Sequence, residues 1–287
     1  MVLMKGVRKI MLGVIIQVLF LCTSVTVEAK RSKGLDLMMI SEQSSISAGS
    51  KFILGVRIKH EKGFHSYWRN PGIVGMATDI KWKLPVGFTV EPIQWPYPEL
   101  SSMAGHPCHG YERDVTLMVQ IQAPEKLSLK QVKLTASLSW MCCADDCFPG
   151  FKDLTITLPV SEKSVVDTKN AAVFNEARKQ LPMNDCPWDV VMLSKQDAAV
   201  IQFRLTMKAS LKGKGGITPE YIFSDDGQIS SDEEQRFIIQ KNGSFLFTIN
   251  RSEFSPKLKK ELSGVLKVGD LYYSIRESYK DFTKVDE

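Results

Sequence analysis

The sequence predicts an all-β protein of two β-sandwich domains joined by a short helical linker. Short segments in which apolar and polar residues alternate follow one another from Leu35 to Val160, with turn residues between them and no intervening helical periodicity. The same pattern resumes at Trp188, after one segment with helical character. Regular short strands of this kind favour sandwiches of two packed sheets.

The amino terminus, residues 1–29, has the pattern of a secretory signal peptide. Basic residues precede an apolar run from Ile10 to about Val25, and the small residue Ala29 follows shortly afterwards. We therefore expect export, with cleavage after Ala29. Two alternatives remain open. The run is near the lower length limit of a membrane span and could be an uncleaved anchor, and Cys22 could carry a lipid, although no small residue precedes it.

The charge and length of the chain limit the classes of protein to which it can belong. The 287 residues carry a net charge of +5, and cleavage after Ala29 would remove three basic residues and one acidic residue, leaving +3. This charge is too small to indicate a nucleic-acid partner. The roughly 258 remaining residues favour two domains. No later segment is apolar enough to predict a membrane span.

The first sandwich is expected in residues 30–163. Its clearest strands are KFILGVRIK, TDIKWKL, VTLMVQIQ, VKLTASLSW and DLTITLPV. Along VKLTASLSW, alternation directs every second residue from Val132 to Trp140, all of them apolar, to one face of the sheet. If this register continued, Cys142 would point into the core and Cys143 away from it.

The helical linker is expected in residues 164–182. In the segment DTKNAAVFNEARKQLP, Asp167 or Thr168 can cap a short helix, and Pro182 ends it.

A second, smaller sandwich is expected in residues 183–287, with a hairpin turn at Gly269–Asp270. Its strands are WDVVMLS, AAVIQFRLTM, RFIIQ, SFLFTIN and the two halves of GVLKVGDLYYSI. The glycine-rich KGKGG at 212–216 lacks the ending of a phosphate-binding loop, so we expect it to connect two strands.

Three of the six cysteines, Cys142, Cys143 and Cys147, lie within six residues. An extended chain would separate the α-carbons of Cys143 and Cys147 by about 13 Å, whereas a disulfide requires about 4.4–6.8 Å. The strand must therefore break if these two are to bond, and the intervening Ala-Asp-Asp is a plausible turn. A bond between the adjacent Cys142 and Cys143 would require strained local geometry.

A disulfide that closes so short a loop adds little chain-entropy stabilisation, and it is better suited to switching between dithiol and disulfide. Exported thiols meet an oxidising environment, and the five cysteines after Ala29 are an odd number, so at least one stays unpaired within the chain. Nearby carboxylates, Asp145 and Asp146, would raise thiol pKa values and tilt the pair towards donating electrons.

Three interpretations of the cluster remain open from the residues alone: a redox pair, a structural disulfide in an adaptor domain, and a metal site. Cysteine and histidine are soft ligands that suit Cu(I) or zinc. The candidate ligands are His106, Cys108, His109, Cys142, Cys143 and Cys147. Their spacing matches no specific zinc template.

The segment CADDCFP, Cys143 to Pro149, resembles the active-site segment of the amino-terminal periplasmic domain of the bacterial thiol:disulfide interchange protein DsbD. The three-residue spacer and the preceding W-x-x-C are more similar to the related suppressor-of-copper-sensitivity protein ScsB. Further similar pieces occur in the same order: GFHSYWRNPG, LPVGF, IQWPYPE and GYERDVTLMVQI. The resemblance covers about residues 35–160 well and the second sandwich more weakly, through YIFSDDG and GVLKVGDLYYSI.

The resemblance implies an immunoglobulin-like periplasmic domain. We expect it to work without a cofactor, with copper binding, suggested by HPCH beside the cysteine cluster, as the alternative. It would receive electrons from a membrane-embedded carrier of the DsbD or CcdA type and pass them to periplasmic thioredoxin-fold proteins. From the resemblance we therefore expect a role connected with cytochrome c-type biogenesis or with copper tolerance. Because this sequence lacks the transmembrane and thioredoxin-like domains of DsbD, we expect either a separately encoded partner or another role.

Carried over by position, Cys143 and Cys147 are the redox pair, and Cys147 forms the mixed disulfide with partners. A loop that shields the pair in the family would lie near residues 97–109, which include Cys108. Tyr67 and Tyr111 are candidates to border the pair, and Cys142 is an addition to it. Cys186 is expected to be a buried thiol, and His65 a hydrogen-bonded strand residue rather than a base.

Overall fold

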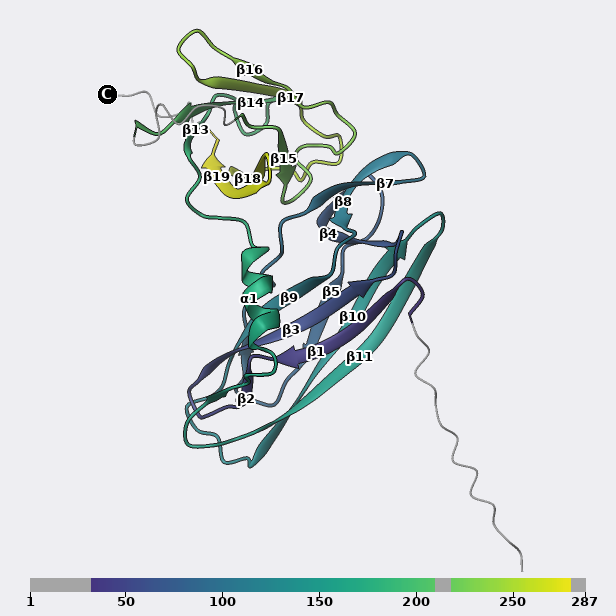
Figure 1. Ribbon diagram of the computed structural model, residues 1–287. Helices are drawn as coiled ribbons and strands as arrows, with labels where there is room; N and C mark the ends of the chain where they lie inside the picture. The colour runs from purple at the N-terminus through teal and green to yellow at the C-terminus, as the bar shows by residue number, and fades with distance from the viewer. Residues whose placement is uncertain (1–31, 210–217, 280–287) are drawn as a thin grey trace, which may run out of the picture. The chain divides into compact units, whose positions relative to one another are not determined.

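Strands dominate residues 32–209 and 218–279, which are the residues that the computed structural model describes (Figure 1). Within these ranges the only α-helix is α1 (Ala171–Lys179). No helix in this described part of the chain has the length and apolar character needed to cross a membrane. The expected signal peptide and the KGKGG segment lie outside the described residues.

Two antiparallel sheets form the first sandwich. One has the strand order β1-β3-β9-β6 and consists of β1 (Leu35–Ser41), β3 (Lys51–His60), β9 (Val115–Gln122) and β6 (Thr89–Val90). The other has the order β11-β10-β4-β8-β7, with β5 also paired to β10. Its strands are β11 (Cys147–Pro159), β10 (Gln131–Cys143), β4 (His65–Gly72), β8 (His106–Tyr111), β7 (Glu99–Met103) and β5 (Asp79–Lys83). A small separate sheet pairs β2 (Gln43–Ser45) with β12 (Val165–Val166).

The alternation along β10 places its apolar side chains as predicted. Every second residue from Val132 to Trp140 is at most 3% exposed, whereas Lys133 on the opposite face is exposed. The inward side chains near the Trp140 end pack with Trp68 of β4 and with Leu117 of β9. This packing between the two sheets fixes the register of β10 and therefore the position of the cysteines at its end.

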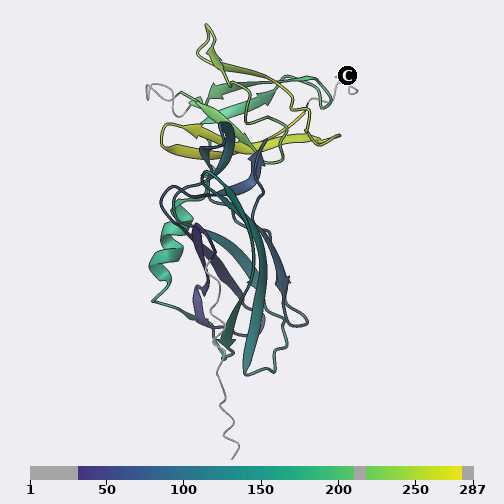
Figure 2. The same ribbon diagram turned by 90° about the vertical axis from the view of Figure 1, so that its right-hand side faces the viewer.

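The helix α1 lies in the expected linker, and Figure 2 shows it against one side of the first sandwich. Its buried residues Phe174 and Ala177 pack against Ile40 and Met118. The predicted cap at Asp167 or Thr168 is wrong, because the N-cap residue is Asn170, without a side-chain cap bond. The Asp167 carboxylate instead accepts hydrogen bonds from the Lys169 amide and from the Asn170 side chain, which forms the turn before the helix.

Two further sheets form the second sandwich, drawn in green to yellow in Figure 1. One has the order β13-β14-β17-β16, from β13 (Trp188–Met192), β14 (Val200–Met207), β17 (Phe245–Asn250) and β16 (Phe237–Ile239). The other has the order β15-β18-β19, from β15 (Tyr221–Ser224), β18 (Glu261–Val268) and β19 (Leu271–Ser278). The predicted turn at Gly269–Asp270 joins β18 to β19, and Gly269 adopts the positive φ of 58° that favours glycine at this position.

The predicted fold class is confirmed: the protein is all-β, and its sheets form immunoglobulin-like sandwiches. The predicted domain boundaries stay predictions. Phe223 of β15 and Val265 of β18 are buried in the same cluster as Trp68, so side chains from the second sandwich complete part of the first sandwich's core.

Candidate redox site

The tip of the β10–β11 hairpin carries the two cysteines. Cys143 is the last residue of β10, Cys147 is the first of β11, and the two are paired in the hairpin register. The chain reverses over Ala144–Asp146, where the Ala144 amide donates to the Asp146 carbonyl oxygen at 3.0 Å. The two α-carbons are 4.1 Å apart, and a disulfide joins the sulfurs. Cys142 remains a free thiol.

The two halves of the disulfide differ in exposure. Cys143 is 0% exposed, whereas Cys147 is exposed. Cys143 does lie in a different cluster from the core residue Cys142, as alternation predicts, but this second cluster buries it as well. The residues that pack around it are Tyr67, Val74, Met103, Cys108 and Met141. A molecule that approaches from solvent therefore meets Cys147 first.

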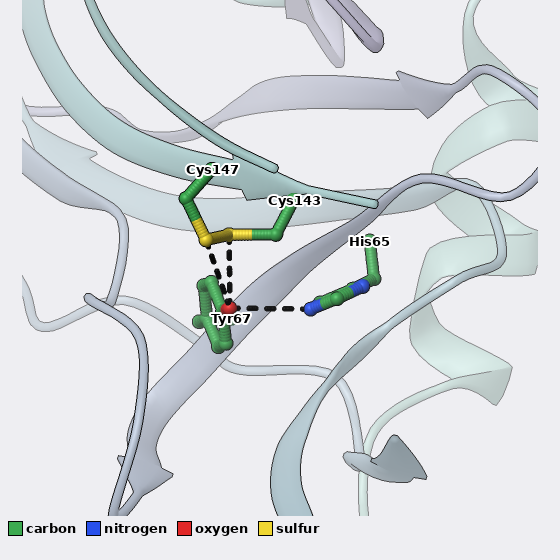
Figure 3. Close-up of a disulfide and its surroundings, with 4 residues drawn as sticks. All are labelled: His65, Tyr67, Cys143 and Cys147. Atoms are coloured by element: carbon green, nitrogen blue, oxygen red, sulfur yellow. Dashed lines mark hydrogen bonds between the residues drawn. A yellow bond between two sulfur atoms is a disulfide. The ribbon is translucent and has the colours of Figure 1, made fainter. Parts of the chain in front are cut away.

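Tyr67 of β4 contacts both sulfurs, as Figure 3 shows. Its hydroxyl donates to Cys143 Sγ at 3.0 Å and lies 4.0 Å from Cys147 Sγ. On its other side, the Tyr67 oxygen lies 3.2 Å from His65 Nε2. His65 pairs with Cys143 across the β4–β10 ladder, and Tyr67 follows two residues later on the same face. The strand register therefore aligns imidazole, phenol and disulfide.

Burial sets the protonation states of Tyr67 and His65. Desolvation, with smaller contributions from Cys108 and Cys142, raises the pKa of the Tyr67 hydroxyl well above its ordinary value. Desolvation also lowers the pKa of His65, and a weaker attraction from Glu112 opposes this effect. Near neutral pH, Tyr67 is therefore a protonated donor and His65 is neutral. In the tautomer with its proton on Nε2, His65 donates to Tyr67 while Tyr67 donates to Cys143.

The β7–β8 hairpin covers the buried end of the disulfide through Met103 and Cys108. It overlaps the shielding segment expected at residues 97–109 and continues to Tyr111. The Cys108 thiol is 0% exposed, and burial raises its pKa to about 11, although a hydrogen bond with Ser101 opposes the shift. Cys108 is therefore an un-ionised thiol packed beside the disulfide near neutral pH.

The sequence of residues 37–159 matches the family described as Thiol:disulfide interchange protein DsbD, N-terminal. This segment belongs to the DsbD N-terminal family. The match confirms the resemblance of the active-site segment and includes the complete β10–β11 hairpin. No curated protein sequence matches the chain.

Solved structures extend the fold comparison beyond the DsbD N-terminal segment. The N-terminal periplasmic domain of ScsB from Proteus mirabilis is similar, with a TM-score of 0.63 and 16% identity, over 87% of this chain and 95% of that chain. The Escherichia coli adhesin FdeC has a TM-score of 0.25 and 12% identity, over 88% of this chain and 67% of that chain. The Bacillus cereus major pilin subunit BcpA has a TM-score of 0.26 and 9% identity, over 85% and 66%. The ScsB likeness shows the fold, and the two low scores carry no argument.

The other predicted site residues lie outside the apolar cluster around Cys143. Cys142 is buried in the main core, where desolvation raises its pKa to about 12. Tyr111 is buried in the same core, and its hydroxyl donates to the Pro96 carbonyl oxygen at 2.9 Å. Asp145 and Asp146 are exposed on the turn. Cys186 is a buried free thiol in the second sandwich, as expected.

The candidate metal ligands are not arranged as a site. His106 is exposed, whereas His109 is buried and both of its ring nitrogens have hydrogen-bond partners, Asn70 and Tyr221. Among residues 32–209 and 218–279, no group of three or more His, Cys, Asp or Glu side chains is placed to hold a metal ion. The copper alternative stays a prediction from sequence that no contact in the structure supports.

His65 is the site residue that sequence reasoning assigned no part in the redox site. It is a hydrogen-bonded strand residue as expected, but its partner is the tyrosine that contacts the disulfide. The feature of the sequence that could have indicated this contact is the two-residue spacing of His65 and Tyr67 in a strand, which places both side chains on one face of the sheet. The pairing of that face with Cys143 depends on the β4–β10 register, which the sequence does not reveal.

Proposed function

We propose that this chain is a thiol–disulfide exchange module that relays reducing equivalents through Cys143 and Cys147. The observation that carries the proposal is the asymmetric disulfide: Cys147 is exposed, while Cys143 is buried against a protonated hydroxyl. An exchange reaction needs one sulfur that an incoming thiolate can reach and a second sulfur that leaves as a stabilised thiolate. The hairpin supplies both.

Loading of the module begins when a thiolate of a reduced donor attacks Cys147 Sγ. The S–S bond to Cys143 breaks, the electron pair moves to Cys143 as a thiolate, and the donor is held to Cys147 by a mixed disulfide. The second donor thiolate then attacks the donor sulfur of this mixed disulfide and releases Cys147 as a thiolate. The donor dithiol is thereby oxidised to a disulfide, and the module takes up two protons and becomes a dithiol.

Delivery reverses these steps on a different partner. The exposed Cys147 thiolate attacks the disulfide of an oxidised recipient, and one recipient sulfur leaves. Cys143, as a thiolate, then attacks Cys147 Sγ, restores the intramolecular disulfide and releases the recipient as a dithiol. The intramolecular attack is favoured because the hairpin pairs the two cysteines directly.

Tyr67 stabilises the charge that develops on Cys143. A hydroxyl that donates to a thiolate favours the ionised form and lowers the thiol pKa, so it opposes the desolvation of Cys143. The raised pKa of Tyr67 keeps the proton on its oxygen. Because a low leaving-group pKa speeds departure in thiol–disulfide exchange, this contact favours attack at Cys147 and release of Cys143.

We place the module in the periplasm, between a membrane-embedded DsbD- or CcdA-like donor and thioredoxin-fold recipients. The family match and the signal-peptide pattern support this location. The chemistry requires two sulfurs and two protein partners, so the proposal involves no cofactor.

Trapping tests the proposal. A thioredoxin-fold protein with a single active-site cysteine is loaded with thionitrobenzoate, whose release is followed by absorbance. In a Cys108→Ser background, Cys143→Ala keeps the exposed thiol and is expected to release the chromophore and form a stable mixed disulfide. Cys147→Ala keeps the buried thiol and is the matched control, expected to react much more slowly.

Equal rates in the two variants would contradict the assignment of Cys147 as the exchanging sulfur. A reduction potential of the wild-type disulfide below about −300 mV would instead indicate a permanent structural bond, because common exchange partners have higher potentials.

A further inference from the structure

The hairpin that covers Cys143 is held by a residue from the second sandwich. Ser231, which is 5% exposed, donates its hydroxyl to the Pro107 carbonyl oxygen at 2.8 Å and accepts from the Ile73 amide at 3.0 Å. Pro107 directly precedes Cys108 in β8, and Ile73 directly follows β4. One hydroxyl therefore links the covering strand to the strand that carries Tyr67.

This contact lies at an irregularity in the pairing of β4 with β8. The β4–β8 register is irregular between Tyr67 and Gly72, and pairing resumes at Gly72 and Cys108. A Cβ atom on Gly72 would lie 2.2 Å from Ser231 Oγ, and its φ is 89°. Glycine thus permits both the backbone conformation and the close approach of Ser231.

His109 provides a second connection between β8 and the second sandwich. Its Nδ1 lies 3.2 Å from the Asn70 carbonyl oxygen, and its Nε2 lies 3.0 Å from the Tyr221 hydroxyl oxygen. Because a carbonyl oxygen only accepts, Nδ1 carries the proton and Nε2 accepts from Tyr221. His109 is 1% exposed, so loss of the Tyr221 hydroxyl would leave a buried acceptor without its partner.

Further contacts fix the same end of β4. The Asn70 side chain donates to the Ser224 carbonyl oxygen at 2.6 Å, and Arg69 forms an ion pair with Asp225. Phe223 packs against the His109 ring, with centroids 4.9 Å apart, and belongs to the cluster of Trp68. The contacts thus span both β4 and β8 beside the disulfide cluster.

We propose that the second sandwich keeps Cys143, the buried half of the disulfide, shielded from solvent by holding the β7–β8 hairpin closed over it, with Ser231 and Tyr221 as positioning residues. This inference rests on the proposed exchange function. Neither residue is in the apolar cluster around Cys143, so both act through β8. Movement of β8 away from Cys143 must break the bonds at Pro107 and His109, and each broken bond leaves a buried polar group unpaired.

The test uses the full chain and substitutions that remove single oxygen atoms. Ser231→Ala removes the bonds to Pro107 and Ile73, Tyr221→Phe removes the bond to His109, and the double variant removes all three. Ser230→Ala is the matched control, since the Ser230 hydroxyl bonds to Asp232 within its own loop. Circular dichroism and the melting temperature establish that each variant is folded.

Three rates are measured for each protein. The first is maleimide labelling of Cys108 in the native state, located by peptide mass mapping. The second is hydrogen exchange of the β7 and β8 amides, and the third is reduction of the disulfide by dithiothreitol. We expect the double variant, which loses three buried hydrogen bonds, to increase all three rates by at least tenfold. Reduction should speed up because an open hairpin lets water stabilise the Cys143 thiolate that leaves. Each single variant is expected to give a smaller increase, and Ser230→Ala none.

Two outcomes separate this inference from the proposed function. If folded variants label, exchange and reduce at the wild-type rates while the disulfide still reacts with a thioredoxin-fold protein, the shielding role is wrong and the exchange function stands. If all three rates increase but no form of the protein reacts with a thioredoxin-fold partner, the hairpin is held as inferred and the exchange function is wrong.

Discussion

The hydroxyl of Tyr67 lies 3.0 Å from Cys143 Sγ, in a cluster from which solvent is excluded. A sulfur in such surroundings would ordinarily be a poor thiolate, because burial disfavours its charged form. The phenol is the polar group that offsets this cost at the point where the disulfide must break. The rate at which the Cys143–Cys147 disulfide exchanges should therefore depend on the hydroxyl oxygen of Tyr67.

Tyr67→Phe should slow exchange. Without the donor, the pKa of the reduced Cys143 thiol rises, and a rise of one unit corresponds to about 1.4 kcal/mol and a factor of ten in thiolate population. Because the rate depends only in part on the leaving-group pKa, we expect reduction by dithiothreitol at pH 7 to slow several-fold, by at most about tenfold. Tyr111→Phe is the matched control, because it removes a buried hydroxyl that bonds to Pro96 instead. Stopped-flow kinetics measure both, and equal rates for the two variants would remove Tyr67 from the mechanism.

Gly75→Ala should disturb the same contact by pushing the Tyr67 ring. A Cβ atom on Gly75 would lie 2.1 Å from Tyr67 Cε1, and the φ of Gly75 is 94°. We expect a loss of about 2–4 kcal/mol in the free energy of unfolding, measured in urea, from overpacking together with backbone strain. Gly243→Ala is the control, because Gly243 has a φ of 80° and no atom within 4 Å of the added methyl. The loss should be larger for Gly75→Ala, and its disulfide should also react more slowly.

The cysteine hairpin was predictable because its evidence is local. Alternation along β10 identified the buried face, and the short spacing between Cys143 and Cys147 required a turn. The contact between Tyr67 and Cys143 was only a possibility from sequence, since residues 76 positions apart meet through the β4–β10 register. Alternation alone directed Cys143 away from the core, and only the family resemblance implied that a segment containing Cys108 covers it, because Cys108 comes from a different hairpin.

The role of Ser231 had no sequence signal at all. A serine in a loop is ordinarily solvated, and nothing near it in the sequence marks Pro107 or Ile73 as its partners. Such contacts join residues far apart in the sequence, so the alternation pattern predicted the sandwiches without predicting the contacts between them. The incorrect cap of α1 has a similar origin, because the Asn170 side chain also donates to Ser41 of β1.

Native-state labelling of the reduced protein should distinguish Cys147 from the three buried cysteines that form no disulfide. Cys147 is exposed and should react with iodoacetamide first. Cys108 and Cys142 have pKa values raised by burial to about 11 and about 12, so at pH 7 only about one thiol in 10⁴ or fewer is ionised. Burial also raises the pKa of Cys186. We expect Cys147 to react at least 100-fold faster than these three, as measured by peptide mass mapping, and comparable labelling of Cys142 would contradict its burial in the core.

The protein should lose stability in mild acid, and His109 should account for much of the loss. Burial lowers the pKa of His109 from 6.5 to about 4, with a smaller opposing effect of the bond to Asn70. Between these two pH values the unfolded chain binds more protons at this residue than the folded chain, so stability rises with pH across the window and is lost as pH falls from about 6.5 to 4. The shift corresponds to a loss on the order of 3 kcal/mol, and the lowered pKa values of His60 and His65 act in the same direction.

Urea unfolding at several pH values measures this dependence. His109→Gln should flatten the curve between pH 6.5 and 4, even if its stability at pH 7 is lower, because the slope reports protons and not packing. The exposed His106 offers the control, and His106→Gln should retain the wild-type slope. A His109→Gln curve as steep as that of the wild type would show that His109 is not the group that takes up the proton, and would place the acid sensitivity at other residues.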